Sequence, residues 1–550
     1  MQLRHAAVCA ALLSLVAAAA SAQQPAMIYG DTLDERALAL VEASDSGYCL
    51  AGWTRSYGYN APAFSNILVV KTNPAAVPQW SLVSAGTDDE EANSLARTRD
   101  GGYAFCGWTR SYGPGIPSAN ALVVKLTAAG ARQWAWAFGG AADDRAFSVV
   151  QTKDSGYALV GYTYTYGPPP YPNIMVVRLN PIGLPMWAKA YWCNPHLGED
   201  EGYSIIQTVD GGYAVAGRAK IRASADFDAF VLKLDPMGNV MWMNFVPGDA
   251  ADEAYSVAED QQANVMAAGW TLSYGTNPMV RTDIFVLQCT QSGVPIWQST
   301  YGWAADDEQV LDDRSLVTTF DGGSALCGPT RSVGPGAPNP NLLLLKLTPA
   351  GAIQWAHSHP SQNYPGSASD VPYPLIQLAA GGYAAAGWTN SFAFLGGDDF
   401  QFASFGPNGS RVICTDSQFP IQDTLRVDGG QMRDTTFMYD WDSLPLQSET
   451  VSYHAICDTT VGVGEQPDRA ASTSGVRLVV DGGISLELAH AAHVDIRLYA
   501  IDGQRITVLV HGRLREGVNR LRLPASTAPG VYIVCGRVDS APVSFKILKL

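Results

Sequence analysis

Charged residues are scarce in this sequence. Of its 550 residues, 16% are Asp, Glu, Lys or Arg, against roughly a quarter in ordinary soluble domains. Basic residues are the scarcer sign: 35 Lys and Arg stand against 51 Asp and Glu, and the formal net charge is −16. Such a chain has little with which to neutralise phosphates, which excludes nucleic acid and anionic lipid surfaces as partners. Hydrophobic residues reach 47%, which excludes general disorder.

Long apolar runs are absent beyond residue 20. The one run, residues 6–20, follows a weakly basic start and leads into Ala-Ser-Ala at residues 20–22, the small-x-small form of a signal-peptidase site. The run is shorter than the roughly 20 residues that span a membrane. We therefore expect residues 1–22 to be a signal peptide, and the mature chain to be exported without a transmembrane segment.

Cysteine pairs and catalytic motifs are missing as well. The eight cysteines after the signal peptide form no CxxC pair, and GxSxG, HExxH and glycine-rich phosphate loops do not occur. Cys106 and Cys327 stand where other repeats carry Ala or Val, which predicts buried thiols. A Cys414–Cys457 disulfide stays open, because export permits one.

Glycine and proline, by contrast, are plentiful, with 54 and 33 residues, and they punctuate an internal repeat. The segment GYCLAGWTRSYG from Gly47 returns as GYAFCGWTRSYG from Gly102 and as GYALVGYTYTYG from Gly156, and four further copies begin at residues 212, 264, 323 and 382. Each copy is followed by an apolar segment such as ILVVK and then a short turn. A tryptophan comes next in six copies, at Trp80, Trp134, Trp187, Trp242, Trp297 and Trp355.

Each unit of about 55 residues holds four short strands, which we name a to d in chain order. Strand a ends in an Asp-Gly-Gly or Asp-Ser-Gly turn, strand b is the GYxxxGxT run, strand c is the VVKL run, and strand d carries the tryptophan. Such turns supply the positive φ of tight hairpins, and strands apolar on both faces belong to covered sheets. Seven such sheets predict an all-β fold, a seven-bladed β-propeller, with a stacked solenoid as the alternative.

The chain begins in the middle of a unit, which favours closure into a ring. Residues 25–36, PAMIYGDTLDER, align with residues 134–145, WAWAFGGAADDR, at the strand-d and following-loop positions. The N-terminal strand is therefore expected to be the outer strand of the last blade, with the propeller spanning residues 23–415. Such a seam removes the open sheet edges that invite aggregation.

The KLDPMGNVMW pattern of residues 233–242 resembles the tryptophan-docking motif of propellers of the pyrroloquinoline-quinone type. The resemblance holds at the level of the blade and implies that each tryptophan packs between neighbouring blades. It does not extend to the quinone, and we expect no cofactor.

The sequence changes character towards its C-terminus. Residues 416–460 are a β-rich extension without a place in the repeat, and residues 461–474 are small and polar, as in a linker. Residues 475–550 form short alternating runs separated by glycine turns, which predicts a small Ig-like β-sandwich.

This last segment resembles the type A C-terminal sorting domain of the type IX secretion system. The resemblance is carried by VDIRLYAIDGQRITVL, REGVNRLRLP, APGVYIVCGRV and the terminal FKILKL. The matching motif positions are Tyr499, Gly503, Arg505, Gly530, Tyr532 and Lys546. The resemblance implies that the type IX machinery carries the chain across an outer membrane and leaves it secreted or on the outer cell surface.

The loops predict which face of the propeller binds. With strand a innermost, the d-to-a and b-to-c loops share one face, and here they are long and variable, whereas the a-to-b and c-to-d turns of the other face are short. Binding sites favour long loops on a rigid scaffold. The candidate ligand contacts on this face are Arg55, Tyr57, Arg110, Tyr112, Tyr166, Tyr274 and Arg331. They offer aromatic faces and cations to a sugar or peptide, although their recurrence favours the alternative that they brace the loop bases.

The same face carries acidic pairs just before strand a. The weak metal candidates among them are Asp143, Asp144, Asp306 and Asp307. Carboxylates suit Ca²⁺, but the DxDxDG spacing of calcium loops is absent, and we favour capping of loop N–H groups. His357 and His359 form a lone HxH, expected at the surface of an outer strand rather than on a metal.

Together these patterns predict a secreted or surface-exposed monomer, not an enzyme and without a catalytic residue, that binds a glycan or protein through its loop-rich face. Two alternatives stay open: an extracellular hydrolase, lyase or quinone-type oxidoreductase that uses this face, and a structural component of the cell surface. A channel lined by small and apolar repeat positions would favour binding. Carboxylates and a histidine converging at the channel mouth would favour an enzyme.

Overall fold

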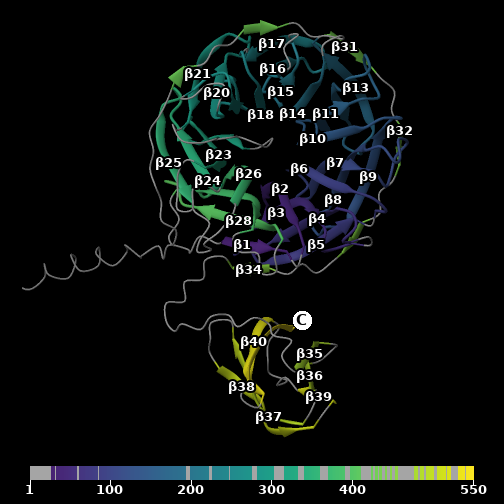
Figure 1. Ribbon diagram of the computed structural model, residues 1–550, viewed down its shortest axis with the longest axis vertical. Helices are drawn as coiled ribbons and strands as arrows, with labels where there is room; N and C mark the ends of the chain where they lie inside the picture. Colours follow the sequence, from purple (N-terminus) through teal and green to yellow (C-terminus); the bar gives the residue numbers. More distant parts are fainter. Residues whose placement is uncertain are drawn as a thin grey trace, which may run out of the picture. The chain divides into compact units, whose positions relative to one another are not determined.

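The computed structural model shows a propeller of seven antiparallel sheets arranged as a ring (Figure 1). It describes residues 26–30, 33–58, 61–84, 86–193, 198–221, 226–246, 248–275, 281–302, 315–331, 340–359, 370–390 and 397–409, six short segments between 423 and 455, and residues 476–480, 484–488, 491–500, 505–515, 517–521, 530–538 and 541–549. Within these ranges no residue is helical, and no helix is long and apolar enough to cross a membrane. The predicted signal peptide and linker, together with Cys414 and Cys457, lie outside them.

Blade 1 shows how a unit folds. Its strands are β2 (Glu35–Glu42), β3 (Tyr48–Thr54), β4 (Asn66–Thr72) and β5 (Pro78–Ser84), paired antiparallel in that order. β4 is buried along its whole length, because both faces of the sheet pack against neighbouring blades. The turn from β2 to β3 holds Ser46 at a φ of 61°, the left-handed region that short turns use.

Blades 2 to 6 repeat this order. Blade 2 consists of β6 (Glu90–Arg97), β7 (Tyr103–Thr109), β8 (Asn120–Leu126) and β9 (Arg132–Gly139). Blade 3 consists of β10 (Asp144–Gln151), β11 (Tyr157–Thr163), β12 (Asn173–Leu179) and β13 (Pro185–Trp192). Blade 4 consists of β14 (Asp200–Gln207), β15 (Tyr213–Ala219), β16 (Asp228–Leu234) and β17 (Val240–Val246). Blade 5 consists of β18 (Asp252–Glu259), β19 (Val265–Thr271), β20 (Asp283–Cys289) and β21 (Pro295–Tyr301). Blade 6 consists of β22 (Leu316–Thr318), β23 (Ser324–Thr330), β24 (Asn341–Leu347) and β25 (Ile353–His359).

Blade 7 closes the ring with the N-terminal strand. Its strands are β26 (Asp370–Gln377), β27 (Tyr383–Thr389), β28 (Asp399–Phe405) and β1 (Ala26–Tyr29). β1 pairs antiparallel with β28, so that Met27 lies opposite Phe402. The predicted all-β fold with seven four-stranded blades is confirmed, and the solenoid alternative is wrong.

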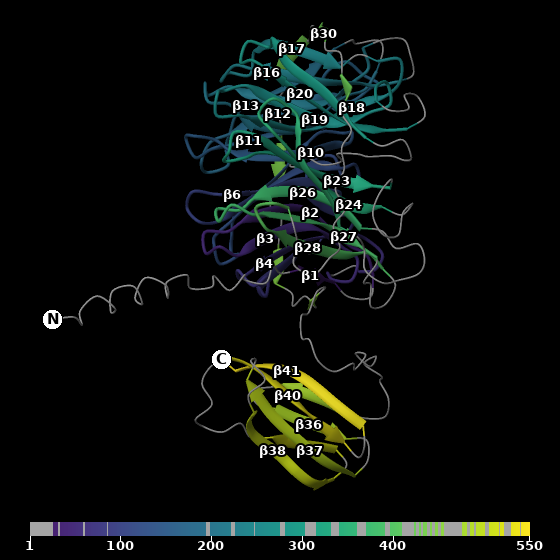
Figure 2. The same ribbon diagram turned by 90° about the vertical axis from the view of Figure 1, so that its left-hand side faces the viewer.

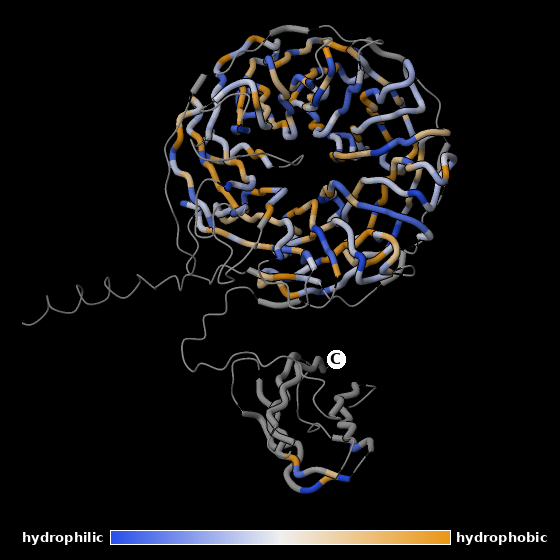
Figure 3. The backbone as a smooth tube through the Cα atoms, in the orientation of Figure 1, coloured by the Kyte–Doolittle hydropathy of each residue, from blue (hydrophilic) through white to orange (hydrophobic). Residues whose placement is uncertain are grey.

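The apolar core lies between the blades, and apolar segments recur around the whole ring (Figure 3). The tryptophan of strand d packs on the c-to-d turn of the next blade. The indole N–H of Trp242 donates to the carbonyl oxygen of Gln291 at 2.9 Å, and the ring lies 2.7 Å from where a Cβ on Gly293 would stand. This close approach requires glycine at the turn. Cys106 and Cys327 are fully buried, as predicted.

The expectation for the HxH pair is wrong, because His357 and His359 are buried. The Nε2 atom of His357 lies 3.0 Å from the carbonyl oxygen of Asn408, and that of His359 lies 3.1 Å from the carbonyl oxygen of Gly409. Strand d of each blade packs on the turn of the next blade, so an outer strand in this ring is not a surface strand.

A belt of six short strands runs around the outside of the ring. We define the belt as β29 (Asp423–Thr424), β30 (Asp428–Gly430), β31 (Arg433–Thr436), β32 (Asp440–Asp442), β33 (Leu446–Ser448) and β34 (Tyr453–Ala455). These strands add a fifth strand to blades 5, 4, 3, 2, 1 and 7 in turn, opposite to the order of the blades (Figure 1). The extension that has no place in the repeat therefore covers the outer edges of six sheets.

Residues 460–550 form a separate compact unit. One antiparallel sheet has the order β35 (Val476–Val480), β36 (Ile484–Leu488), β39 (Gly517–Leu521), and the other has the order β38 (Arg505–Leu514), β37 (Ala492–Ala500), β40 (Gly530–Val538), β41 (Ala541–Lys549) (Figure 2). Of the motif residues, Tyr499 pairs with Arg505, Gly530 with Lys549, Tyr532 with Ile547, and Lys546 with Ile533. Gly503 lies outside the described residues.

Candidate functional site

A buried carboxylate begins strand a in five blades, at the loop-rich face. These residues are Glu35, Glu90, Asp144, Asp200 and Asp252. Each accepts hydrogen bonds from the adjoining loops: Thr109 Oγ1 donates to Glu90 Oε1 at 3.0 Å, and Ser273 Oγ donates to Asp252 Oδ2 at 2.8 Å. The carboxylates thus hold the bases of the loops in place.

Asp143 and Asp144, the two metal candidates among the described residues, accept hydrogen bonds from backbone N–H groups of the protein. Asp143 Oδ1 accepts the Ala119 N–H at 2.9 Å, and Asp144 Oδ2 accepts the Gly140 N–H at 2.8 Å. Asp306 and Asp307 lie outside the described residues. Within those residues, no group of three or more His, Cys, Asp or Glu side chains is placed to hold a metal ion.

Burial governs the ionisation of the capping carboxyls. Desolvation raises the pKa of Asp252 to about 7, against the hydrogen bonds from Thr271 and Ser273, and the charge of Asp228 acts in the same direction as burial. Desolvation likewise raises the pKa of Asp200 to about 7. These groups therefore change charge near neutral pH rather than in acid.

We expect the stability of the protein to fall between about pH 4 and pH 7, and Asp252→Asn to reduce that fall. The folded protein keeps a proton on Asp252 up to about pH 7, whereas the unfolded chain releases it near 3.8. The stability gained from this proton is therefore complete below pH 3.8 and is lost as the pH rises through 7, on the order of 4 kcal/mol for one group. Unfolding in urea at pH 5 and pH 8 measures it.

The matched control for this experiment is Asp235→Asn. Desolvation raises the pKa of Asp235, but hydrogen bonds from Asn239 and Met237 outweigh it and lower the pKa below 3.8. Asp235 therefore affects stability only in acid, and Asp235→Asn should leave the loss of stability between pH 5 and pH 8 unchanged. Equal pH dependence in the parent and in Asp252→Asn would contradict the assignment.

A ring of charged side chains follows directly after the capping carboxylates. We define the mouth ring as Arg36, Glu91, Arg145, Glu201, Glu253 and Arg218. The first five are the second residues of strand a in blades 1 to 5, and each pairs across the ladder with a residue near the end of strand b: Trp53, Trp108, Tyr162, Arg218 and Trp270. Strand a begins and strand b ends at the loop-rich face, so the ring lies there.

Arg36 joins blades 7 and 1. Its guanidinium lies 4.6 Å from the centre of the Trp388 ring and 5.6 Å from that of Trp53, and it forms an ion pair with Asp398 at 2.6 Å. The Arg36 side chain remains about a third exposed, so part of it is accessible to a ligand.

Arg145 joins blades 2 and 3 in the same way. Its guanidinium lies 4.0 Å from the centre of the Trp108 ring, whose indole N–H donates to Glu91 Oε2 at 3.3 Å. Beside it, Tyr162 makes an edge-to-face contact with the exposed ring of Tyr164 at 5.7 Å. Cations, carboxylates and aromatic faces therefore alternate over a short distance.

Arg218 joins blades 4 and 5. It forms ion pairs with Glu201 at 3.2 Å and with Glu253 at 2.8 Å. Tyr203 and Tyr255 stack with ring centres 4.5 Å apart, and their hydroxyls donate to Glu201 and Glu253. Burial raises the pKa of both tyrosines well above 10, so the hydroxyls remain donors.

Two of the sequence-predicted contacts lie beside the mouth ring. Arg55 lies 6.0 Å from the centre of the Trp53 ring, and Arg110 lies 5.7 Å from that of Trp108. Arg331 is exposed just beyond the end of β23. The arginines at the loop bases thus lie on the loop-rich face of the propeller.

The predicted tyrosines lie deeper. Tyr57, Tyr112, Tyr166 and Tyr274 are half-buried and pack against the apolar clusters between blades. The hydroxyl of Tyr166 donates to the Gly139 carbonyl at 2.8 Å, and that of Tyr57 to the Gly30 carbonyl at 3.2 Å. These contacts tie the b-to-c loop to the preceding strand d.

Sequence reasoning missed the basic members of the mouth ring. It singled out acidic pairs, whereas Arg36 and Arg145 each follow a capping carboxylate as a single charge of opposite sign. The signal was the alternation Arg, Glu, Arg, Glu at this position in blades 1 to 4, which becomes visible when the repeats are aligned on the capping residue.

The comparisons with known proteins add no function. No protein-family model matches the sequence, and no curated protein matches it. A crystal structure of a protein of unknown function from Dyadobacter fermentans is similar at 12% identity and a TM-score of 0.34, over 56% of this chain and 93% of that chain.

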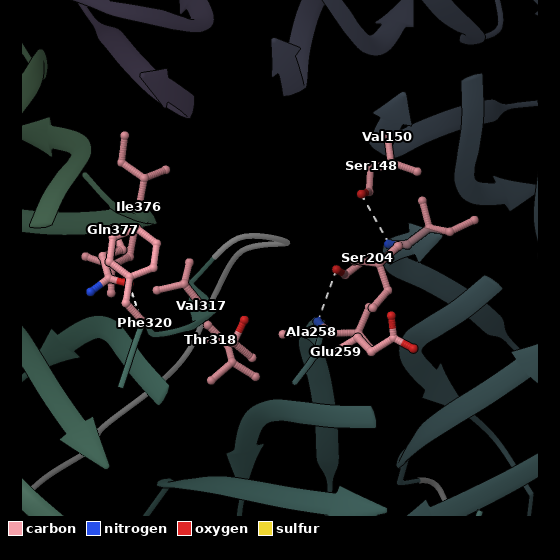
Figure 4. A pocket seen from close by; sticks show the side chains of 15 residues that line it. Ser148, Val150, Ser204, Ala258, Glu259, Val317, Thr318, Phe320, Ile376 and Gln377 are labelled. Carbon is pink, nitrogen blue, oxygen red and sulfur yellow. Dashed lines mark hydrogen bonds between the residues drawn. The ribbon is translucent and has the colours of Figure 1, made fainter. Parts of the chain in front are cut away.

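Behind the mouth ring, the second half of strand a in blades 3 to 7 lines a cavity of about 430 Å³ (Figure 4). Its apolar wall includes the repeat-equivalent residues Val150, Ile206, Ala258, Val317 and Ile376, and its carboxylate is Glu259. The hydroxyls of Ser148 and Ser204 accept the N–H groups of Ile205 and Val257 in the next blade, each at 3.2 Å (Figure 4). These serines join neighbouring blades, which is a structural role.

Proposed function

We propose that this protein is a secreted or cell-surface binding protein whose mouth ring holds a glycan. The observation that carries the proposal is the stacking of Arg36 and Arg145 on tryptophans at the loop-rich end, with carboxylates beside them. Aromatic faces cover the apolar faces of sugar rings, and guanidinium and carboxylate groups hydrogen-bond sugar hydroxyls. A protein ligand is the alternative at the same site.

Binding is favoured over catalysis by the way the mouth ring is paired. Arg218 forms ion pairs with Glu201 and Glu253 within the ring. Arg36 is paired with Asp398, and Glu91 accepts the indole N–H of Trp108. General acid–base chemistry needs a group poised to exchange a proton with a substrate. Asp200 and Asp252, whose pKa values are raised to about 7, are buried and accept hydrogen bonds from the protein's own loops. The buried histidines of β25 lie on an outer strand. A channel lined by apolar repeat positions likewise supports a binding role.

A glycan array followed by titration calorimetry on the mature chain tests this proposal. We expect Arg145→Ala and Tyr164→Ala to weaken binding of the best glycan by about tenfold or more, because each removes a stacking surface. Arg132→Ala is the control, since Arg132 is exposed at the start of strand d, at the opposite end of blade 2. Ca²⁺ alone should give no heat. Absence of any glycan response, or equal affinity in all variants, would refute a glycan site at the mouth ring.

Delivery by the type IX machinery rests on the resemblance of residues 475–550 to a sorting domain. Deleting these residues is expected to leave the propeller behind the outer membrane, because the segment read by the machinery is gone. Immunoblots of medium, cell surface and periplasm measure the distribution. Undiminished appearance of the truncated chain outside the cell would contradict a sorting role.

A further inference from the structure

Exposed apolar side chains cluster on blades 3, 4 and 5, at the c-to-d turn end of the ring. We define the apolar patch as Ile182, Leu184, Met186, Met237, Met241, Val294 and Ile296. Their exposed fractions run from 40% for Leu184 to 66% for Met237. The c-to-d turns and the starts of strand a lie at opposite ends of a blade, so the apolar patch and the mouth ring occupy opposite faces.

The other blades show that the fold does not require this patch. The residue before the strand-d tryptophan is Met186, Met241 and Ile296 in blades 3 to 5, and Gln79, Gln133 and Gln354 in blades 1, 2 and 6. The turn residue that is Ile182 in blade 3 and Met237 in blade 4 is alanine in blades 1, 2 and 6. The ring thus closes equally well with smaller or polar residues, and a contiguous exposed apolar surface points to a partner.

The docked tryptophans make the patch continuous from blade to blade. Trp187 lies within 3 Å of where a Cβ on Gly238 would stand, directly beside Met237 in the next blade. Trp242 approaches Gly293, next to Val294, in the same way. Three blades therefore present one surface rather than three separate spots.

The described belt strands do not extend along the strand edge beside this patch. It pairs with residues 189–192 of β13, 243–245 of β17 and 299–300 of β21. The first halves of these strands, which carry Met186, Met241 and Ile296, have no outer strand partner among the described residues. Among the described residues, backbone groups without an outer strand partner thus lie next to exposed apolar side chains, a combination that favours docking of another chain.

Carboxylates flank the patch. Asp235 lies in the same turn as Met237, and Asp260 lies in the a-to-b turn of blade 5. Asp154, in the a-to-b turn of blade 3, is paired with Arg178 and adds little to this border. The exposed cation of these turns, Lys153, has its ammonium held by the carbonyls of Thr208 and Val209. A second copy would bring these carboxylates together and an anionic lipid surface would be repelled, whereas Lys and Arg beside an apolar face would be attracted.

We propose that the apolar patch is the docking site of a protein partner, through an amphipathic segment whose apolar face is flanked by Lys or Arg. Methionine side chains adapt to varied apolar surfaces, and the acidic border sets the sign of the partner's charge. This site lies apart from the mouth ring, so the protein would join the ligand held at one face to a partner held at the other.

The test compares the mature chain with the triple variant M186Q/M241Q/I296Q, which carries the residue of blades 1, 2 and 6 at all three positions. The probe is an 18-residue amphipathic helical peptide of Leu and Lys, with a scrambled peptide of the same composition. Fluorescence anisotropy is expected to show at least tenfold weaker binding to the triple variant, weaker binding of the scrambled peptide, and a Kd that rises with salt. Ile116→Gln is the control, because Ile116 is equally exposed in a loop outside the patch.

Equal binding of the peptide by parent and triple variant would overturn the proposal. Concentration-dependent dimerisation of the parent, measured by light scattering and abolished in the triple variant, would also overturn it by assigning the patch to a second copy. Binding to phosphatidylcholine vesicles that the triple variant loses would overturn it in favour of a lipid surface. Melting temperature and glycan binding should be the same in both proteins, because the new glutamines are those of the other blades.

Discussion

A chain that ends at residue 415 is expected to melt about 10 °C below one that ends at residue 460, and to associate in solution. The belt adds two to four paired residues to each of six blades, and its removal uncovers their outer edges together. Differential scanning calorimetry and light scattering on the two chains, both starting at residue 23, measure the effect.

Supplying the belt as a separate peptide shows whether it stabilises the propeller by covering strand edges rather than by lengthening the chain. A synthetic peptide of residues 420–458 should restore a monomer and part of the lost melting temperature, because the belt contacts the ring through backbone pairing. A peptide of the same composition in scrambled order should do so less well. Equal melting temperatures for the two chains, without association, would show that the belt contributes nothing to stability.

Replacing Asp210 by alanine is expected to destabilise the propeller by about 3 kcal/mol or more. Lys233 is fully buried in β16, where its ammonium lies 2.9 Å from Asp210 Oδ2 and donates to the carbonyl of Leu234. Without Asp210 this buried charge loses its counter-ion. The double variant D210A/K233M should recover most of the loss, because a methionine fills the site without a charge. Urea unfolding of both variants measures this, and a loss under 1 kcal/mol for Asp210→Ala would contradict it.

The same pairing gives the propeller an acid limit. Equivalent ion pairs join Lys71 to Asp45, Lys125 to Asp100, Arg178 to Asp154 and Lys346 to Asp321. Desolvation raises the pKa of Asp100 and Asp210, but hydrogen bonds from Thr and Lys side chains outweigh it and lower the pKa of each to about 2. The stability that these aspartates contribute is present above about pH 4 and is lost as the pH falls towards 2.

The fold could be predicted because the repeat constrains it so heavily. Seven copies of a glycine-bearing strand, six of them preceded by an Asp-containing turn and all followed by an apolar strand, leave few arrangements other than a ring. The lysine of VVKL is a single charge at the end of an apolar strand. Only the sheet register shows that Lys233 reaches the Asp210 turn, because this contact joins residues 23 apart in the chain.

The belt and the mouth ring could not be predicted, for different reasons. The sequence indicated a β-rich extension at residues 416–460 but not where its strands pair. The belt strands are two to four residues long and their partners lie at least 123 residues away, so local periodicity cannot assign them to blades. The mouth ring depends on which side chains of different blades converge: Arg36 meets Trp388 more than 350 residues later only because the ring closes. The aligned repeats did predict the face on which it lies.

The seventh sheet sets the order in which the molecule can fold. Its strands come from both ends of the propeller chain, since Met27 pairs with Phe402 on one side and with Ala455 on the other. Contacts between residues so distant in sequence must wait for the intervening chain and slow the folding of β-rich proteins. During synthesis from the N-terminus, β1 has no partner until some 370 further residues have emerged, and the sheet is complete only when the last belt strand arrives. The ring can therefore close only after β28 has emerged, and its seventh sheet gains its last strand just before the C-terminal unit begins.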